Sequence, residues 1–198
     1  MVNQALEIEF WHWFERNQAK LFNFEDSQEE IFDELSEALA KVHPDLTFEF
    51  GREVNGTRDF VISADGIISA FPAVESLHSK APTLPKWKFI KFRQRGNLDF
   101  EIEFAGLQLS PKDLMFTLEP NKGKLGITVF VKNYRNDPKK IYANMIYLCL
   151  DQALGEYDVE TKVGYIKILP MMTETHLTKH SFTELPRIFD KAYKTLSH

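Results

Sequence analysis

The stretch DLTFEFGREVNGTRDFVISADG, residues 45–66, decides the fold class of this chain. Residues that favour strands, mainly Phe, Val, Ile and Thr, lie on both sides of the dipeptide Asn55-Gly56. Asn-Gly is typical of a two-residue type I′ hairpin turn, and this turn sets Phe50 beside Val61 in an antiparallel register. Asp65-Gly66 then turns the chain out of the second strand. The stretch therefore predicts antiparallel sheet.

Helices precede and follow this hairpin. Apolar residues recur at helical spacing over 4–22 and over 28–42, where Ser27 and Glu30 have the spacing of a capping box. Turn and cap residues delimit the remaining expected helices: a short one after Gly66, one from Asp137-Pro138 to Gly155, and a last one behind Thr183. The mixture predicts an α+β fold, with mostly antiparallel sheet, two N-terminal helices and one C-terminal helix.

A second hairpin is expected to join residues 87–93 to residues 98–105. A three-residue loop, Arg95-Gly96-Asn97, pairs Phe92 with Phe100 on one face of this hairpin. The same register places two pairs of opposite charge on the other face, Arg93 with Asp99 and Lys91 with Glu101. The charged positions of this hairpin are therefore expected to neutralise each other.

The chain also contains a candidate internal repeat. A shift of 68 residues lays Asp45-Leu46-Thr47-Phe48 on Asp113-Leu114-Met115-Phe116. The order strand, strand, helix, strand is expected in residues 45–93 and again in residues 113–169, whose strands lie near 113–118, 125–132 and 159–169. The alternative is that any two ββαβ segments look alike, because Leu, Phe and Val are common in strands. Either way, 198 residues are expected to form a single domain over 1–198.

Composition narrows the class of protein. The 24 Lys and Arg residues and 29 Asp and Glu residues give a formal charge of −5, which argues mildly against a protein that binds nucleic-acid phosphates. The one cysteine, Cys149, lies in an apolar run and is expected to be a buried residue of a reducing cytoplasm. The N-terminus lacks a basic signal-peptide region, and no window approaches 18 uncharged apolar residues. A cytoplasmic protein without membrane spans is expected.

Six short segments carry a resemblance to a known family. They are Phe10-Trp11-x-Trp13-Phe14, His43-Pro44-Asp45-Leu46, Ile62-Ser63-Ala64-Asp65-Gly66, Ala81-Pro82 ahead of Trp87, Phe92-Arg93, and Leu154-Gly155-Glu156-Tyr157-Asp158. In these segments the chain resembles a family of bacterial cytoplasmic proteins that contain a domain of unknown function. The resemblance implies a bacterial cytoplasmic origin and assigns no catalytic residue.

Two groups of residues could bind a metal ion or exchange protons. His176 and His180, with Glu174 nearby, would put two imidazoles on one face of a helix, although the glutamate of an HExxH motif is missing. The alternative is an exposed linker with two solvated histidines. Three alternating acids, Asp99, Glu101 and Glu103, could act as paired carboxylates, or could belong to the charge-paired hairpin face. No metal and no cofactor is therefore expected.

Two aromatic-rich segments could bind bases or sugars. Trp11, His12 and Trp13, with Glu15 on the same helix, could stack against a ring, but aromatic core packing is the favoured alternative. The second segment has the composition of a surface that binds single-stranded nucleic acid. Its basic residues are Lys86, Lys88, Lys91, Arg93 and Arg95, and its aromatic residues are Trp87, Phe89 and Phe92. Acidic neighbours are expected to cancel its field, so nucleic-acid binding is not favoured.

No nucleophile or cofactor motif is present, and no catalytic residue is expected. The leading hypothesis is a non-catalytic binding or regulatory protein that acts through a protein partner. Its candidate acidic surface is Glu25, Asp26, Glu29, Glu30, Asp33 and Glu37, for which the alternative is the solvated side of an amphipathic helix. Two other hypotheses stay open: an immunity-type inhibitor of a toxin, and an enzyme with a cleft between the two halves.

Overall fold

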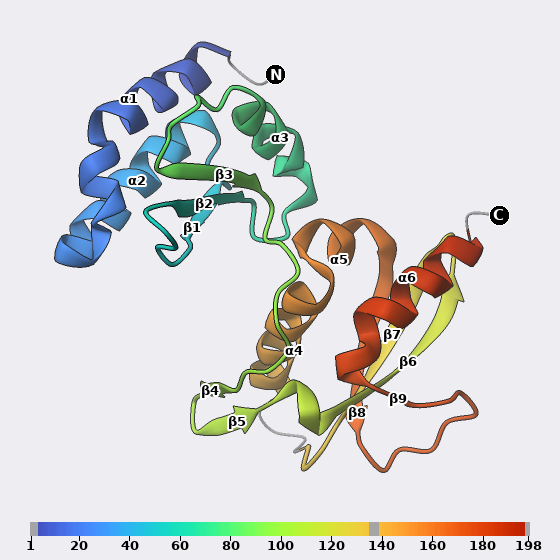
Figure 1. The fold of residues 1–198 in the computed structure, drawn as a ribbon. Helices are drawn as coiled ribbons and strands as arrows, with labels where there is room; N and C mark the ends of the chain where they lie inside the picture. Colours follow the sequence, from blue (N-terminus) through green and yellow to red (C-terminus); the bar gives the residue numbers. More distant parts are fainter. Residues whose placement is uncertain (1–3, 135–138, 197–198) are drawn as a thin grey trace. The chain divides into compact units, whose positions relative to one another are not determined.

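A computed structural model describes residues 4–134 and 139–196 and confirms the α+β fold (Figure 1). The chain divides into two compact units, Met1–Arg93 (unit 1) and Gln94–His198 (unit 2). A single domain over 1–198 was expected, whereas the buried apolar residues form two separate clusters, one in each unit. The clusters are separate because the helices of each unit cover that unit's own sheet.

Unit 1 begins with the two predicted helices. Its elements are α1 (Gln4–Phe22), η1 (Phe24–Ser27), α2 (Gln28–Val42), β1 (Thr47–Phe50), β2 (Arg58–Ser63), η2 (Ile68–Ala70), α3 (Phe71–Ser79) and β3 (Trp87–Lys91). The predictions of helices over 4–22 and 28–42 are confirmed. Ser27 is the N-cap of α2, but its side chain makes no capping hydrogen bond, so the predicted capping box does not form.

The predicted hairpin forms, with a different register. Asn55 and Gly56 have φ values of 53° and 77°, as a type I′ turn requires. Phe50 lies opposite Phe60, however, so the predicted pairing with Val61 is wrong by one residue. The reason is a bulge in the first strand. Val54 pairs with Thr57, as the predicted register requires. Two residues of the first strand then lie opposite the single residue Arg58, so that the Gly51 N–H donates to the Asp59 carbonyl.

The second predicted hairpin is wrong. β3 pairs with β2, in parallel, with Phe89 opposite Phe60. α3 provides the crossover connection that a parallel pair needs. The following strand, β4 (Ile102–Phe104), instead forms a small antiparallel pair with β5 (Leu107–Leu109) around Ala105-Gly106. The proposed pairing of Phe92 with Phe100 therefore does not form.

Unit 2 continues after β5 with a four-stranded sheet and its helices. Its further elements are η3 (Pro111–Asp113), β6 (Leu114–Asn121), β7 (Lys124–Val131), α4 (Lys139–Leu154), α5 (Glu156–Lys162), β8 (Val163–Pro170), β9 (His180–Ser181), η4 (Phe182–Glu184) and α6 (Leu185–Leu196). The strand order is β8-β7-β6-β9, with β7 and β8 parallel. A strand was predicted from 159, but α5 occupies 156–162. The predicted cap Asp137-Pro138 lies outside the described residues.

The two units share one order of connections. In each, an antiparallel hairpin is followed by helix and then by a strand parallel to the hairpin's second strand. This order matches the prediction for residues 45–93 and 113–169. The constant shift of 68 does not hold throughout, because the turn Asn55-Gly56 corresponds to Lys122-Gly123, one residue short of that shift. Common descent of the halves stays a prediction.

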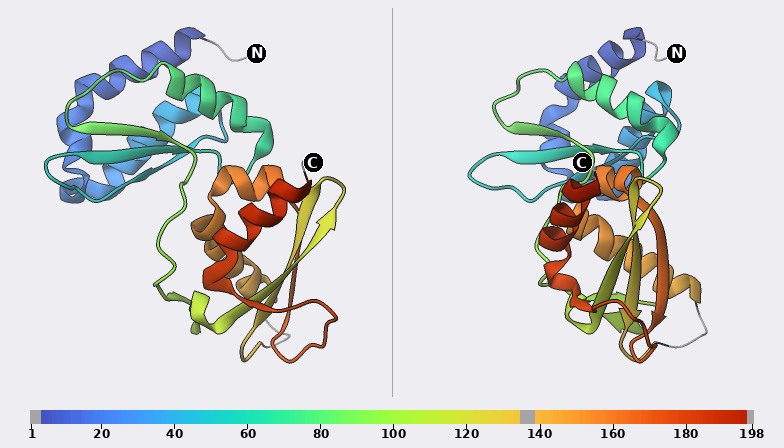
Figure 2. Two further views of the ribbon diagram at one scale, coloured as in Figure 1. Left: turned by 45° about the vertical axis from the view of Figure 1, so that its right-hand side comes forward. Right: turned by 90° about the vertical axis from the view of Figure 1, so that its right-hand side faces the viewer.

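The helices of unit 1 cover one face of its sheet (Figure 2). At the centre of that face, the ring of Phe14 on α1 lies 5.0 Å from the rings of both Phe60 and Trp87. Trp11 ties the same helix to α3, because its indole Nε1 donates to the Leu77 carbonyl at 2.8 Å. α1 is therefore held in one rotation about its axis, which decides the side chains that it turns toward α2.

Within residues 4–134 and 139–196, no helix has the length and apolarity that a membrane crossing demands.

Candidate functional site

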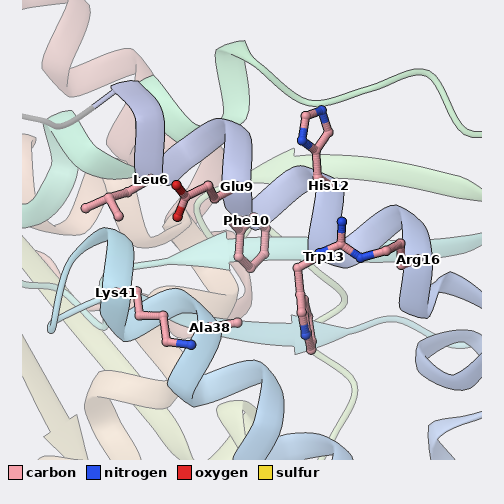
Figure 3. Close-up of a pocket in the computed structure, with 8 residues that line it drawn as sticks. All are labelled: Leu6, Glu9, Phe10, His12, Trp13, Arg16, Ala38 and Lys41. Carbon is pink, nitrogen blue, oxygen red and sulfur yellow. The ribbon is translucent and has the colours of Figure 1, made fainter.

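A cavity of about 350 Å³ opens between α1 and α2 of unit 1 (Figure 3). Cavities of roughly 300–1,000 Å³ are the usual size of binding pockets. We call it the α1–α2 groove. It is lined by Leu6, Glu9, Phe10, His12, Trp13 and Arg16 of α1 and by Ala38 and Lys41 of α2.

The floor of the groove is apolar. Phe10 is buried and Trp13 is half-buried, with ring centroids 6.2 Å apart. Opposite them α2 presents Ala38, and the small side chain leaves the space unfilled. Figure 3 shows the Trp13 ring on one side of Ala38 and the Lys41 side chain on the other. The small side chain of Ala38 thus lies between the Trp13 ring and the Lys41 side chain in the lining of the groove.

The rim of the groove is charged. Glu9, His12, Arg16 and Lys41 are all exposed at its edge. His12 points away from the Trp13 ring, so these two side chains do not face a common ligand position (Figure 3). An apolar floor with a polar rim is the usual anatomy of a protein–protein contact.

The predicted aromatic cluster on α1 is divided between two environments. Trp11 is 3% exposed and lies in the core, where its ring centroid is 4.6 Å from that of Phe89. Trp13 lines the groove instead. Residues two apart on a helix point about 200° away from each other, so these two side chains cannot grip one ligand. Core packing therefore explains Trp11, whereas Trp13 lines the groove.

Ion pairs hold the two walls of the groove together. The Lys20 ammonium on α1 donates to Glu34 at 2.8 Å and to Glu30 at 3.1 Å, both on α2. These bonds, chiefly the one to Glu34, raise the pKa of Lys20 above its ordinary value. The turn η1, which precedes α2, is held separately, because Arg58 donates to Glu25 at 2.8 Å and lies 4.7 Å from the Phe24 ring.

Two of the six predicted acidic residues are engaged by these pairs, Glu25 with Arg58 and Glu30 with Lys20. The other four are exposed: Asp26, Glu29, Asp33 and Glu37. Within the part of the chain that the structure describes, no ion pair joins any of the four to a basic residue. We call them the acidic stripe, because spacings of three and four residues place them on one side of α2 and of the turn before it.

The candidate metal ligands, which were not favoured as a metal site, are not on a helix. His176 and Glu174 lie in the loop between β8 and β9, and His180 begins β9. They therefore do not present two imidazoles on one helical face. Among residues 4–134 and 139–196, no group of three or more His, Cys, Asp or Glu side chains is arranged to hold a metal ion.

The predicted charge pairs of the second hairpin are wrong. Asp99 binds Lys112 at 2.6 Å, and this hydrogen bond lowers the pKa of Asp99. Arg93 binds Asp65 at 2.7 Å, and Lys91 lies 3.4 Å from Glu75. The strands that were expected to pair lie in different sheets, so the acids that face the basic residues come from elsewhere.

The basic segment 86–95 is nevertheless matched by acids. Lys88 lies 3.9 Å from Asp59, and Arg95 binds Asp158 and Asp190 at 2.7 and 2.8 Å. With the pairs of Lys91 and Arg93 described above, four cations of this segment have carboxylate partners within their own unit. Such pairing reduces the positive field that would attract a phosphate backbone.

No protein-family model, no curated protein and no solved structure matches this chain. The resemblance to a bacterial family therefore stays a prediction.

Proposed function

We propose that this protein is a non-catalytic binding protein that engages a protein partner in the cytoplasm by taking an apolar side chain into the α1–α2 groove. The supporting observation is a space of about 350 Å³ that is lined by the half-buried Trp13, the buried Phe10 and Ala38. Burying a large apolar side chain there contributes about 1.5–3 kcal/mol. That is the range of a side chain that dominates an interface.

The rim favours a protein over a small molecule as the ligand. It carries both signs of charge, Glu9 against Arg16 and Lys41, around an apolar centre. Trp and Arg are enriched among the residues that dominate protein interfaces. A partner that places an apolar side chain at the centre and polar groups around it matches this arrangement. The enzyme and immunity-type hypotheses stay open as alternatives.

A matched pair of substitutions on α2 tests the proposal. Ala38→Leu fills the groove, whereas Ala40→Leu makes the same change at an exposed position of the same helix. Wild type and both variants are used to capture proteins from the native cell, after circular dichroism has established that all three are folded. We expect a partner that wild type and Ala40→Leu retain and Ala38→Leu loses.

Trp13→Ala is the second probe, because it removes part of the apolar floor of the groove without adding volume. We expect it to weaken capture of the same partner at least tenfold, about 1.4 kcal/mol. Retention of every captured protein by both Ala38→Leu and Trp13→Ala would overturn the proposed function.

A further inference from the structure

We infer that a second copy of this chain binds to the exposed side of α4, so that the two α4 helices of a dimer pack against each other in antiparallel orientation. This interaction surface goes beyond the proposed function, because it lies in unit 2 and uses no residue of the α1–α2 groove. We call it the α4 face and define it by Lys140, Asn144, Tyr147, Leu148 and Asp151. With 3.6 residues per turn, these five side chains fall within an arc of about 100° on one side of the helix.

The α4 face is apolar between its two charged residues. Tyr147 and Leu148 are 46% and 55% exposed, whereas the opposite side of the same helix supplies much of the core of unit 2. A helix that is apolar all round is expected to be buried on every side. No described segment of unit 2 covers these two side chains, so the exposed side of α4 has the character of an interaction surface.

The two charges of the α4 face are opposite in sign and lie at opposite ends of the helix. Lys140 is in the first turn of α4, and Asp151 is in its last turn. The dipole of a helix favours anions at its start and cations at its end, so both residues are placed against the dipole of their own helix. These charges therefore do not stabilise α4 by itself.

An antiparallel pair of α4 helices makes both charges favourable. In such a pair each end of one helix lies beside the opposite end of the other, so Lys140 meets the second copy's Asp151 and the negative end of its dipole. The two-fold axis repeats this contact, so one interface contains two such ion pairs. A parallel pair would instead place like charges side by side. The charges thus specify a second copy in antiparallel orientation as the occupant.

The apolar residues fit the same arrangement. Leu148 shares one edge of the helix side with the partly buried Ile141, and Tyr147 shares the other edge with Ala143. Across the two-fold axis each edge meets the same edge of the second copy. In the register that the ion pairs set, Leu148 lies about 3 Å along the axis from the second copy's Ile141, and Tyr147 about 1.5 Å from its Ala143. Each large exposed side chain therefore meets an aliphatic or small residue.

The size of the α4 face predicts a weak dimer. From Lys140 to Asp151 it runs about 16 Å along the helix. A single helix pair of this length is small beside the roughly 1,200–2,000 Å² of stable interfaces. Sedimentation equilibrium of the full chain from about 5 to 500 µM measures the association. We expect the average mass to rise from that of one chain toward twice that mass, and a single-chain mass at every concentration would overturn the inference.

Exchanging the charges tests the orientation. Lys140→Glu and Asp151→Lys each place like charges opposite one another in a self-pair, so each variant alone is expected to dimerise at least about tenfold more weakly at low salt. An equal mixture of the two should recover the association of wild type, because each variant supplies the charge that the other lost. The dipole of α4 favours both substitutions, so neither is expected to unfold the helix. A mixture that associates no better than the separate variants would rule out the antiparallel pairing.

A matched pair of substitutions tests the apolar part of the face. Leu148→Gln removes an apolar side chain from it, and Ile8→Gln makes the same kind of change on α1, where Ile8 is 49% exposed. After circular dichroism has established that both variants are folded, we expect Leu148→Gln to weaken dimerisation at least about tenfold and Ile8→Gln to leave it within about twofold. Equal effects of the two would contradict the assigned surface. Ala38→Leu should leave dimerisation unchanged, and a dimer lost in that variant would place the interface at the groove instead.

Discussion

Arg93 and Arg95 are separated only by Gln94, yet their guanidinium groups bind carboxylates of different units. Arg93 binds Asp65 at 2.7 Å in unit 1. Arg95 donates to both carboxylate oxygens of Asp190, at 2.8 and 2.9 Å, in unit 2. Two arginines that are two positions apart therefore form ion pairs in different units.

Arg95→Ala is expected to destabilise unit 2 by about 2 kcal/mol at neutral pH. Arg95 also donates to Asp158 at 2.7 Å and to the Leu154 carbonyl at 3.0 Å, so one side chain joins α4, α5 and α6. Urea denaturation measures the change. Arg187→Ala is the control, because its pair with Glu184 is exposed and its loss should cost less than about 0.5 kcal/mol. Equal effects of the two substitutions would contradict the assigned role.

The contribution of Arg95 should depend on pH. Its hydrogen bond lowers the pKa of Asp190 below the ordinary value of 3.8. A carboxylate whose pKa is lower in the folded state contributes stability that is complete above the unfolded pKa and is lost as pH falls through the folded pKa. We expect the stability difference between wild type and Arg95→Ala to be constant from about pH 7 to 5 and to narrow below about pH 4. A difference that grows in acid would contradict this assignment.

Lys80→Met should destabilise unit 1 strongly. Glu7 on α1 is fully buried and forms an ion pair with Lys80, and its Oε1 atom has no hydrogen-bond partner within the described residues. Removing Lys80 leaves a buried carboxylate without a counter-charge, which costs about 3–5 kcal/mol. The double variant Glu7→Leu with Lys80→Met should recover part of this loss. Chemical denaturation at pH 7 tests both, and a double variant less stable than Lys80→Met would rule out the explanation.

Cys149 should resist alkylation in the folded protein. Its side chain is fully buried in α4, and burial raises the pKa of the thiol to about 12. At pH 8 only about one thiol in ten thousand would be ionised even if reagent had access. We expect stoichiometric reaction with a thiol reagent in denaturant and a rate at least about 1,000-fold lower without it. Complete labelling of the native protein within minutes would contradict the buried placement.

Residues 1–93 should fold without unit 2. Every residue of the first hydrophobic cluster lies in unit 1, and so do both partners of the ion pairs Arg58–Glu25, Lys80–Glu7 and Arg93–Asp65. A fragment that ends at Arg93 keeps all of these contacts. We expect a helical circular dichroism spectrum and a cooperative thermal transition. A fragment without a cooperative transition would show that the cluster needs the rest of the chain.

The helices were predictable from sequence because their signals are local. Residues 4–22 and 28–42 have apolar side chains at helical spacing, and this periodicity does not depend on what the helix contacts. Asn55-Gly56 is also a local signal, because it favours positive φ at two successive residues. The register beyond the turn differs from the prediction because a bulge beside Arg58 shifts the pairing by one residue, and no local sequence signal marks this bulge.

Strand partners were not predictable in the same way. The apolar pattern of residues 87–91 predicts a strand there, but it does not indicate which other strand will pair with it. α3 carries the chain across the sheet, so β3 lies beside β2 instead of pairing with the next strand in sequence. The charge partners of Lys91 and Arg93 changed with it.

For the candidate site, too, some features were predictable from sequence and others were not. The sequence by itself determined that Trp11 and Trp13 lie on a helix, that Ala38 lies on the next helix, and that an acidic row follows that helix's exposed side. Only the tertiary structure decided that Trp11 lies in the core, where its indole N–H donates to the Leu77 carbonyl, and that Trp13 lies in the groove beside Ala38. The physical reason is that periodicity is a property of neighbouring residues, whereas a groove requires two helices to meet at one particular rotation.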